Sequence, residues 1–187
     1  MLVVPLVSAT PRLAGVAGVS PPARHCTHPL GFDMNEVSGT DHRIVPSFCP
    51  VAYVGERWTP AASWTTNTTY EAIPEGYTPS RSTPMEDSLA KFVEGGYVID
   101  AGTGHERTFS FPAADIVQLV SAPGSGVPTA AIMPVLPPLP PGPHTVDIFF
   151  VLNAAHWDAF GTDRHSMLPA GVTHCSHIEF TGERRNR

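Results

Sequence analysis

The stretch LPPLPPGPHTVDIFFVL, residues Leu136–Leu152, decides the fold class of this chain. Its second half, His144–Leu152, is rich in β-branched and aromatic residues, which favour a pleated and half-buried strand. Side chains alternate between the two faces of a strand, so Val146, Ile148 and Phe150 share one face. We expect that face to line a hydrophobic core.

The first half of the stretch, Leu136–Pro141, is rich in proline. Proline has no N–H to donate to a sheet, so we expect this part to lie at a sheet edge or outside the sheet. The Pro-Gly-Pro sequence at 141–143 predicts a turn. We therefore predict that Ala130–Leu136 and His144–Leu152 pair as the central hairpin.

The composition favours a β protein with many turns. The chain has 187 residues with 21 prolines and 16 glycines, and that length fits one domain with a substantial core. We predict an all-β fold, an immunoglobulin-like or jelly-roll antiparallel sandwich with one short helix, over residues 44–181. Residues 1–43 are expected to form an irregular N-terminal arm, with a remnant leader as one interpretation of its start, and residues 182–187 a disordered tail.

Local signals predict the other main elements. Thr83 followed by proline, with Glu86 three residues after the threonine, is a capping box and predicts the short helix. Alternating patterns and a glycine-rich turn predict a hairpin. The expected elements are a helix at Pro84–Glu94, hairpin strands at Tyr97–Asp100 and Arg107–Phe111, a long polar loop at Asn153–Gly171 and a closing strand at Thr173–Thr181.

Charge and hydropathy exclude two classes of function. The net charge is −6 and the pI is about 5.8, without the clustered Lys and Arg that phosphate contacts need, so we expect no nucleic-acid partner. No apolar run reaches the roughly 18–20 residues of a membrane-spanning helix. Met1–Ser20 is apolar but lacks the basic start of a complete signal peptide.

The three cysteines, Cys26, Cys49 and Cys175, leave two arrangements open. In an exported protein Cys26 could pair with Cys49 and leave Cys175 free, whereas three reduced thiols are the alternative, because pairing cannot be deduced from sequence.

Two segments carry a resemblance to other proteins. The run Phe109–Phe111, followed by a strand and then by Leu136–Val146, resembles a loose group of uncharacterised exported bacterial β-sandwich proteins with a C-terminal LxPLxPGxHT turn and strand. The resemblance covers residues 95–181, about half of the chain. It implies a sandwich fold and a secreted or periplasmic location, and it brings no catalytic residues.

A histidine- and cysteine-rich segment near the end of the chain suggests a metal site. On a regular strand Cys175 and His177 would point to one face and His174 to the other, and this pair suits zinc or copper. His156, Asp158, Asp163 or His165 from the preceding loop would complete the ligand set. The alternative is a pair of strand-edge histidines beside a buried thiol.

Aromatic residues suggest a second kind of site. Trp58 and Trp64 lie in a threonine-rich stretch, and Trp157 lies in the long loop, so together they could bind a carbohydrate. Packing in the core is the alternative interpretation, because aromatic residues dominate cores as well as interfaces.

No nucleophile elbow, phosphate-binding loop or supported pair of carboxylates occurs in the sequence. The leading hypothesis is therefore a non-catalytic exported binding or structural module for an unknown protein or carbohydrate ligand. A metal-binding protein or metalloenzyme and a carbohydrate-binding module are the alternatives.

Overall fold

The structure is a computed structural model that describes residues 26–29, 31–60, 62–119, 126–161 and 166–184. Its helices are α1 (Met34–Ser38), α2 (Pro84–Lys91) and the 3₁₀ helix η1 (Ala113–Asp115). Its strands are β1 (Arg43–Ile44), β2 (Val51–Tyr53), β3 (Trp58–Thr59), β4 (Ala62–Thr65), β5 (Phe92–Ile99), β6 (Arg107–Pro112), β7 (Ile116–Leu119), β8 (Thr129–Ile132), β9 (Gly142–Leu152), β10 (His156–Trp157), β11 (Met167–Leu168) and β12 (Gly171–Glu183).

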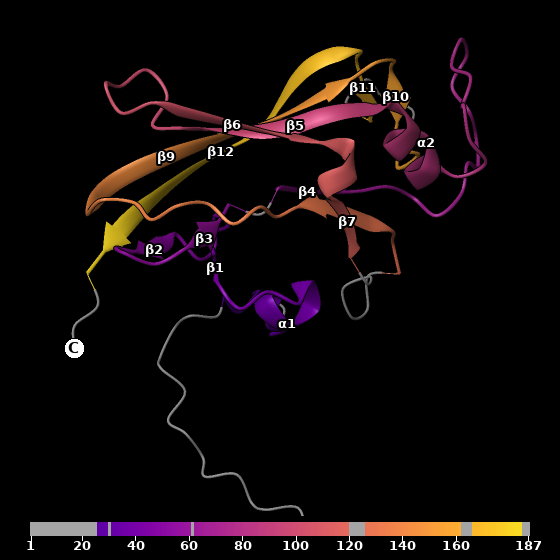
Figure 1. Cartoon of the computed structure of the whole chain (residues 1–187). Coiled ribbons are helices and arrows are strands. Elements are labelled where there is room, and N and C mark those ends of the chain that lie inside the picture. Colours follow the sequence, from indigo (N-terminus) through magenta and orange to yellow (C-terminus); the bar gives the residue numbers. More distant parts are fainter. Residues whose placement is uncertain (1–25, 30, 61, 120–125, 162–165, 185–187) are drawn as a thin grey trace, which may run out of the picture.

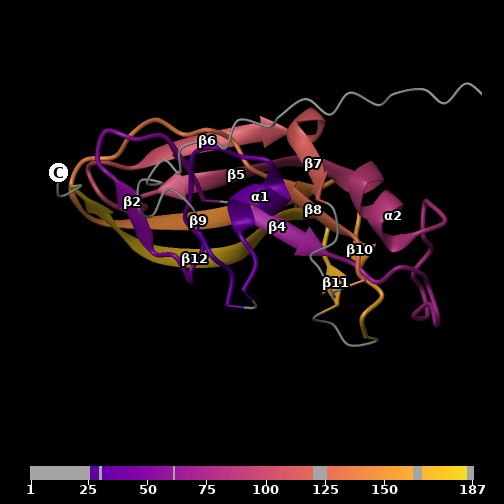
Figure 2. The same ribbon diagram turned by 90° about the horizontal axis from the view of Figure 1, so that it is seen from below.

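Two sheets form the body of the molecule. A five-stranded sheet has the order β2-β12-β9-β5-β6, and a three-stranded sheet has the order β4-β8-β7. In Figure 1 the five-stranded sheet is one curved layer, and β4, β7 and α1 lie on one side of it. Figure 2, which views the molecule from below, shows β4 and β8 in front of that layer. The all-β, sandwich-like prediction is confirmed.

The core fills the space between these two sheets. The predicted inward face of β9, Val146, Ile148 and Phe150, is buried there. Ile132 from β8 and Tyr97 from β5 join the same cluster. The Tyr97 hydroxyl bonds across the core, donating to the Ile132 carbonyl at 2.5 Å.

The predicted central hairpin is wrong. β9 pairs with β5 and β12, whereas β8 pairs with β4 and β7 in the other sheet. The prolines explain the difference, because β8 ends at Ile132 and the chain from Met133 to Pro141 makes no ladder apart from one bridge between Leu136 and Trp58. This proline-rich segment carries the chain from one sheet to the other instead of reversing it within a sheet.

The capping box is confirmed, but the helix ends early. Thr83 accepts from the Glu86 N–H, and the Glu86 carboxylate accepts from the Thr83 N–H. We expected the helix to run to Glu94, and it ends at Lys91. Phe92 instead starts β5 and pairs with Leu152 of β9, so strand pairing in the core overrides the local helical pattern.

The described parts of the expected arm and tail are more regular than predicted. Residues 34–38 of the expected irregular arm form α1, and Arg43 begins β1. Gly182 and Glu183, placed in the expected tail, belong to β12 and pair with β2 in parallel, so the main sheet is not purely antiparallel. The expected loop at Asn153–Gly171 contains the small hairpin of β10 and β11.

Within these described ranges no helix has the length and apolar character needed to span a membrane.

Candidate functional site

An open groove of about 1000 Å³ lies at one end of the five-stranded sheet. One wall is the turn that follows β5, from Asp100 to His105, and the other is the Pro140–Thr145 segment at the start of β9. Glu179, Phe180 and Thr181 of β12 and Pro50 before β2 complete the lining. Prolyl rings and Phe180 make much of this surface apolar, and carboxylates and threonines add polar groups.

A histidine–aspartate pair joins the two walls of the groove. His144 Nδ1 lies 2.9 Å from Asp100 Oδ2, and its Nε2 lies 3.0 Å from the carbonyl oxygen of Pro140. Asp100 also accepts from the Thr145 N–H. Both ring nitrogens of His144 therefore lie within hydrogen-bond distance of oxygen atoms in the groove walls. These contacts of His144 join the two walls of the groove.

A second polar cluster is buried between α2, β10 and the loop before α2. Asp87 is completely buried, and its Oδ2 accepts from Tyr77 Oη at 2.5 Å, from Lys91 Nζ at 2.8 Å and from His156 Nδ1 at 3.0 Å. Its Oδ1 accepts from the backbone N–H and the hydroxyl of Ser80. Each carboxylate oxygen therefore has at least two donors, as a buried charge requires.

The charge states in this cluster follow from its hydrogen bonds. Burial opposes ionisation of Asp87, but the bonds from Lys91, Tyr77 and His156 outweigh it and hold the pKa of Asp87 well below its usual value. Burial also disfavours charged Lys91, yet Asp87 raises the pKa of this lysine. For His156 burial dominates and lowers the pKa. The cluster is thus an Asp–Lys ion pair with a neutral histidine attached.

This cluster has one feature of a catalytic pair. Asp87 orients His156 through Nδ1, as an aspartate orients the histidine of a hydrolase. His156 Nε2, however, is buried and has no hydrogen-bond partner among the described residues, and the same is true of Tyr70 Oη. Burial of His156, which is 1% exposed, keeps that nitrogen away from any substrate, so the pair stabilises the contact between α2 and β10.

The predicted metal ligands do not converge. A β-bulge between His174 and Ser176 leaves Cys175 without a partner on β9. The predicted alternation of faces is therefore wrong, because a bulge inserts one residue and shifts the following side chains to the other face. His174 and His177 pair with Phe149 and Asp147, which share one face of β9.

The other members of the set lie elsewhere. His177 bonds to Asp147 at 2.6 Å, whereas His156 is buried in the α2 cluster and His165 lies outside the described residues. Partial desolvation raises the pKa of the Cys175 thiol, which opposes the thiolate that binds zinc or copper. In the part of the chain that the structure describes, no group of three or more His, Cys, Asp or Glu side chains is arranged to hold a metal.

The tryptophans pack inside the molecule. Trp58 is 1% exposed and donates from Nε1 to the Pro137 carbonyl. Trp157 is 2% exposed and donates to the Gly161 carbonyl. Trp64 is half-buried, stacks on Phe92 and donates to Ser88. A sugar-binding face needs exposed rings, so the packing of these three residues favours the alternative interpretation, in which they belong to the core.

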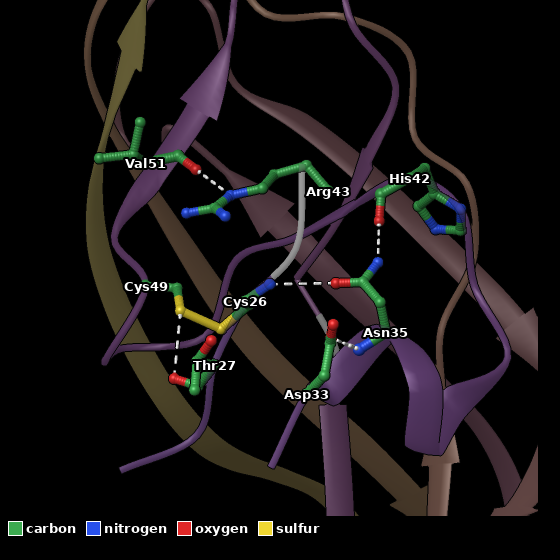
Figure 3. The surroundings of a disulfide bond; sticks show 8 residues. All are labelled: Cys26, Thr27, Asp33, Asn35, His42, Arg43, Cys49 and Val51. Atoms are coloured by element: carbon green, nitrogen blue, oxygen red, sulfur yellow. Dashed lines mark hydrogen bonds between the residues drawn. A yellow bond between two sulfur atoms is a disulfide. The ribbon is translucent and has the colours of Figure 1, made fainter. Parts of the chain in front are cut away.

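A disulfide joins Cys26 to Cys49, and Cys175 is the exposed free cysteine. Of the two arrangements left open by the sequence, the structure has the first. Figure 3 shows the surroundings of the disulfide, where buried Asn35 accepts from the Cys26 N–H and donates to the His42 carbonyl. These contacts attach α1 and the segment before β1 to the rest of the domain.

Sequence reasoning missed the main features of both sites. It treated His144 as a strand-start residue and did not single out Asp100, which lies 44 positions away. A signal for the buried cluster was present, because Lys91 is the one lysine of the chain and lies four residues after Asp87 on the capped helix.

Comparison with family models, with curated proteins and with solved structures gave no match to this chain.

Proposed function

We propose that the protein is a non-catalytic binding module of an oxidising compartment, secreted or periplasmic, and that its ligand is held in the groove between the turn after β5 and the start of β9. The groove is the observation that carries this proposal. Its volume of about 1000 Å³ is at the upper end of the roughly 300–1000 Å³ typical of ligand sites.

The walls of the groove support a binding role because they are rigid. Proline fixes its own φ, and the bonds of His144 to Asp100 and to the Pro140 carbonyl tie one wall to the other. A pre-formed site loses little conformational entropy when a ligand binds. The same two bonds occupy both nitrogens of His144, which favours binding over acid–base catalysis at this position.

The disulfide supports the proposed compartment. Disulfides persist in oxidising environments and are rare in reducing ones. The Cys26–Cys49 bond attaches a segment of few strand contacts to the domain, so its loss in a reducing compartment would weaken that attachment.

The test is a groove-filling substitution. Ala101 lines the groove and is exposed, so Ala101→Trp obstructs the groove while His144 and Asp100 themselves are kept. Ala114→Trp, on the exposed η1 helix, is the matched control. The purified chain is screened against an oligosaccharide array and a phage-displayed random peptide library. We expect ligands that bind the wild type and the control and bind Ala101→Trp at least tenfold more weakly. Ligands that bind all three proteins equally, or no ligand from either screen, would overturn the proposal.

A further inference from the structure

The segment Leu136–Pro141, which enters the groove from β8, buries every third residue. Leu136 and Leu139 are in the core, whereas Pro137, Pro138 and the two prolines after Leu139 are exposed. A period of three residues matches neither a strand nor an α-helix. It matches the polyproline II helix, which has three residues per turn.

Backbone restrictions and hydrogen bonds agree with this period. Proline fixes φ near the polyproline II value, and a residue before proline is held in the extended or polyproline II region. Four of the six residues, starting with Leu136, precede a proline. Two carbonyls three positions apart face the domain: Pro137 accepts from Trp58 Nε1 at 3.0 Å, and the Pro140 oxygen lies 3.0 Å from His144 Nε2. The leucines and these carbonyls attach the segment, and the prolyl rings remain outside.

We propose that this segment is a polyproline II ridge that docks a protein partner through exposed aromatic side chains on that partner. The inference rests on the proposed function, because Pro140 and Pro141 of the ridge form a wall of the groove. Aromatic-lined surfaces recognise polyproline II segments by fitting rings between successive prolines, and a ridge that is already rigid loses little entropy on binding.

Charge adds a second property of the partner. Glu179 lines the groove beside the ridge, and its side chain is 84% exposed. Asp100 on the opposite wall is bonded to His144. The exposed carboxylate of Glu179 favours a basic side chain next to the aromatic ones on the partner.

The experiment separates the ridge from the groove. Pro137 and Pro138 are exposed on the ridge and lie outside the groove lining. The double substitution Pro137→Ala, Pro138→Ala removes their rings and keeps the carbonyl that Trp58 uses. Pro112→Ala, at an exposed proline ending β6, is the matched control. A phage-displayed random peptide library is selected on the full wild-type chain, and enriched peptides are synthesised and titrated against each variant. Amide NMR spectra verify that each variant keeps the fold.

We expect the enriched peptides to contain tryptophan or tyrosine next to lysine or arginine. They should bind the double variant at least tenfold more weakly and bind Pro112→Ala like the wild type. Some peptides could fail to bind Ala101→Trp, which shows that they need the open groove, and still bind the double variant normally. That result would overturn the ridge and leave the proposed function standing. Peptides that respond to the double variant alone would support the ridge and count against the groove. Peptides indifferent to both substitutions would overturn both proposals. An empty peptide selection would overturn the ridge, and it would overturn the groove as well if the oligosaccharide array also gave no ligand.

Discussion

Replacing Asp87 by asparagine should destabilise the protein strongly, although the two side chains have nearly the same shape. Oδ1 of Asp87 accepts from Ser80, and Oδ2 accepts from Tyr77, Lys91 and His156. Asparagine has one oxygen and one amide nitrogen. In either orientation its nitrogen would therefore face N–H or O–H donors and leave buried polar groups unpaired.

The magnitude follows from the burial of the partners. Asp87 is fully buried and Lys91 is nearly so, and removing one member of a buried ion pair costs about 3–5 kcal/mol. A domain of this size has a free energy of unfolding of about 5–15 kcal/mol. The substitution should lower the melting temperature by roughly 6–20 °C, because each kcal/mol shifts it by about 2–4 °C.

The assay is urea unfolding at pH 7, followed by far-ultraviolet circular dichroism. Asp115→Asn, at an exposed aspartate in η1, is the control and should change the free energy of unfolding by no more than about 0.5 kcal/mol. The pKa of Asp87 is lowered in the folded state, so its contribution is complete above the unfolded pKa of about 3.9 and is lost as the pH falls below it. The gap between wild type and Asp87→Asn should narrow in acid. An unfolding free energy within about 1 kcal/mol of the wild type at pH 7 would refute the reasoning.

Three further outcomes are expected. The Cys26–Cys49 disulfide joins residues 23 positions apart, and its reduction should lower the free energy of unfolding by about 2–4 kcal/mol. Urea titrations with and without dithiothreitol measure this difference, and overlapping curves would contradict the prediction. Gly96→Ala should prevent folding or destabilise the protein by several kcal/mol, because an added Cβ would meet the backbone oxygen of Phe109 and the ring of Phe149. A Cβ added in the control, Gly104→Ala, meets nothing. Equal melting temperatures for the two variants would refute the packing argument. The pKa of His156 is lowered in the folded state, so the free energy of unfolding falls as the pH drops below the unfolded pKa of about 6.5. The variant His156→Gln should therefore lose less stability than the wild type between pH 7 and pH 5. Identical slopes of stability against pH would count against a neutral buried histidine.

Local patterns predicted those elements whose signals are local. The inward face of β9 and the hairpin of β5 and β6 follow from alternation and turn residues, and both are confirmed. The capping box at Thr83 begins α2 as predicted. Each of these signals lies within a few residues of the element that it specifies.

Pairing between distant strands could not be predicted in the same way. β9 lies between β5 and β12 because its inward side chains complete the core beside those of Tyr97 and Ile178. No local pattern carries that information. The Pro-Gly-Pro turn instead led us to predict that β9 pairs with β8, which lies in the other sheet. The bulge at Cys175 is likewise set by the register against β9, so it altered the predicted faces of the histidines.

The candidate site was predictable only in its parts. The sequence placed His144 at the start of a predicted strand, but its contacts with Asp100 and the Pro140 carbonyl depend on the fold. The three tryptophans stood out as well, yet residue type alone does not distinguish an exposed ring from a buried one.

The parallel pairing of β2 with β12 has a consequence for the order of folding. Val51 pairs with Thr181, 130 positions later (181 minus 51), and Val54 donates to the Glu183 carbonyl. During synthesis β2 has no partner until the ribosome has released Glu183, and closing so long a loop is slow. The Cys26–Cys49 bond needs none of those later residues. The edge at β2 is therefore among the last parts of the sheet to be completed, and a nascent chain stalled before Thr181 would present an unpaired strand to chaperones and proteases.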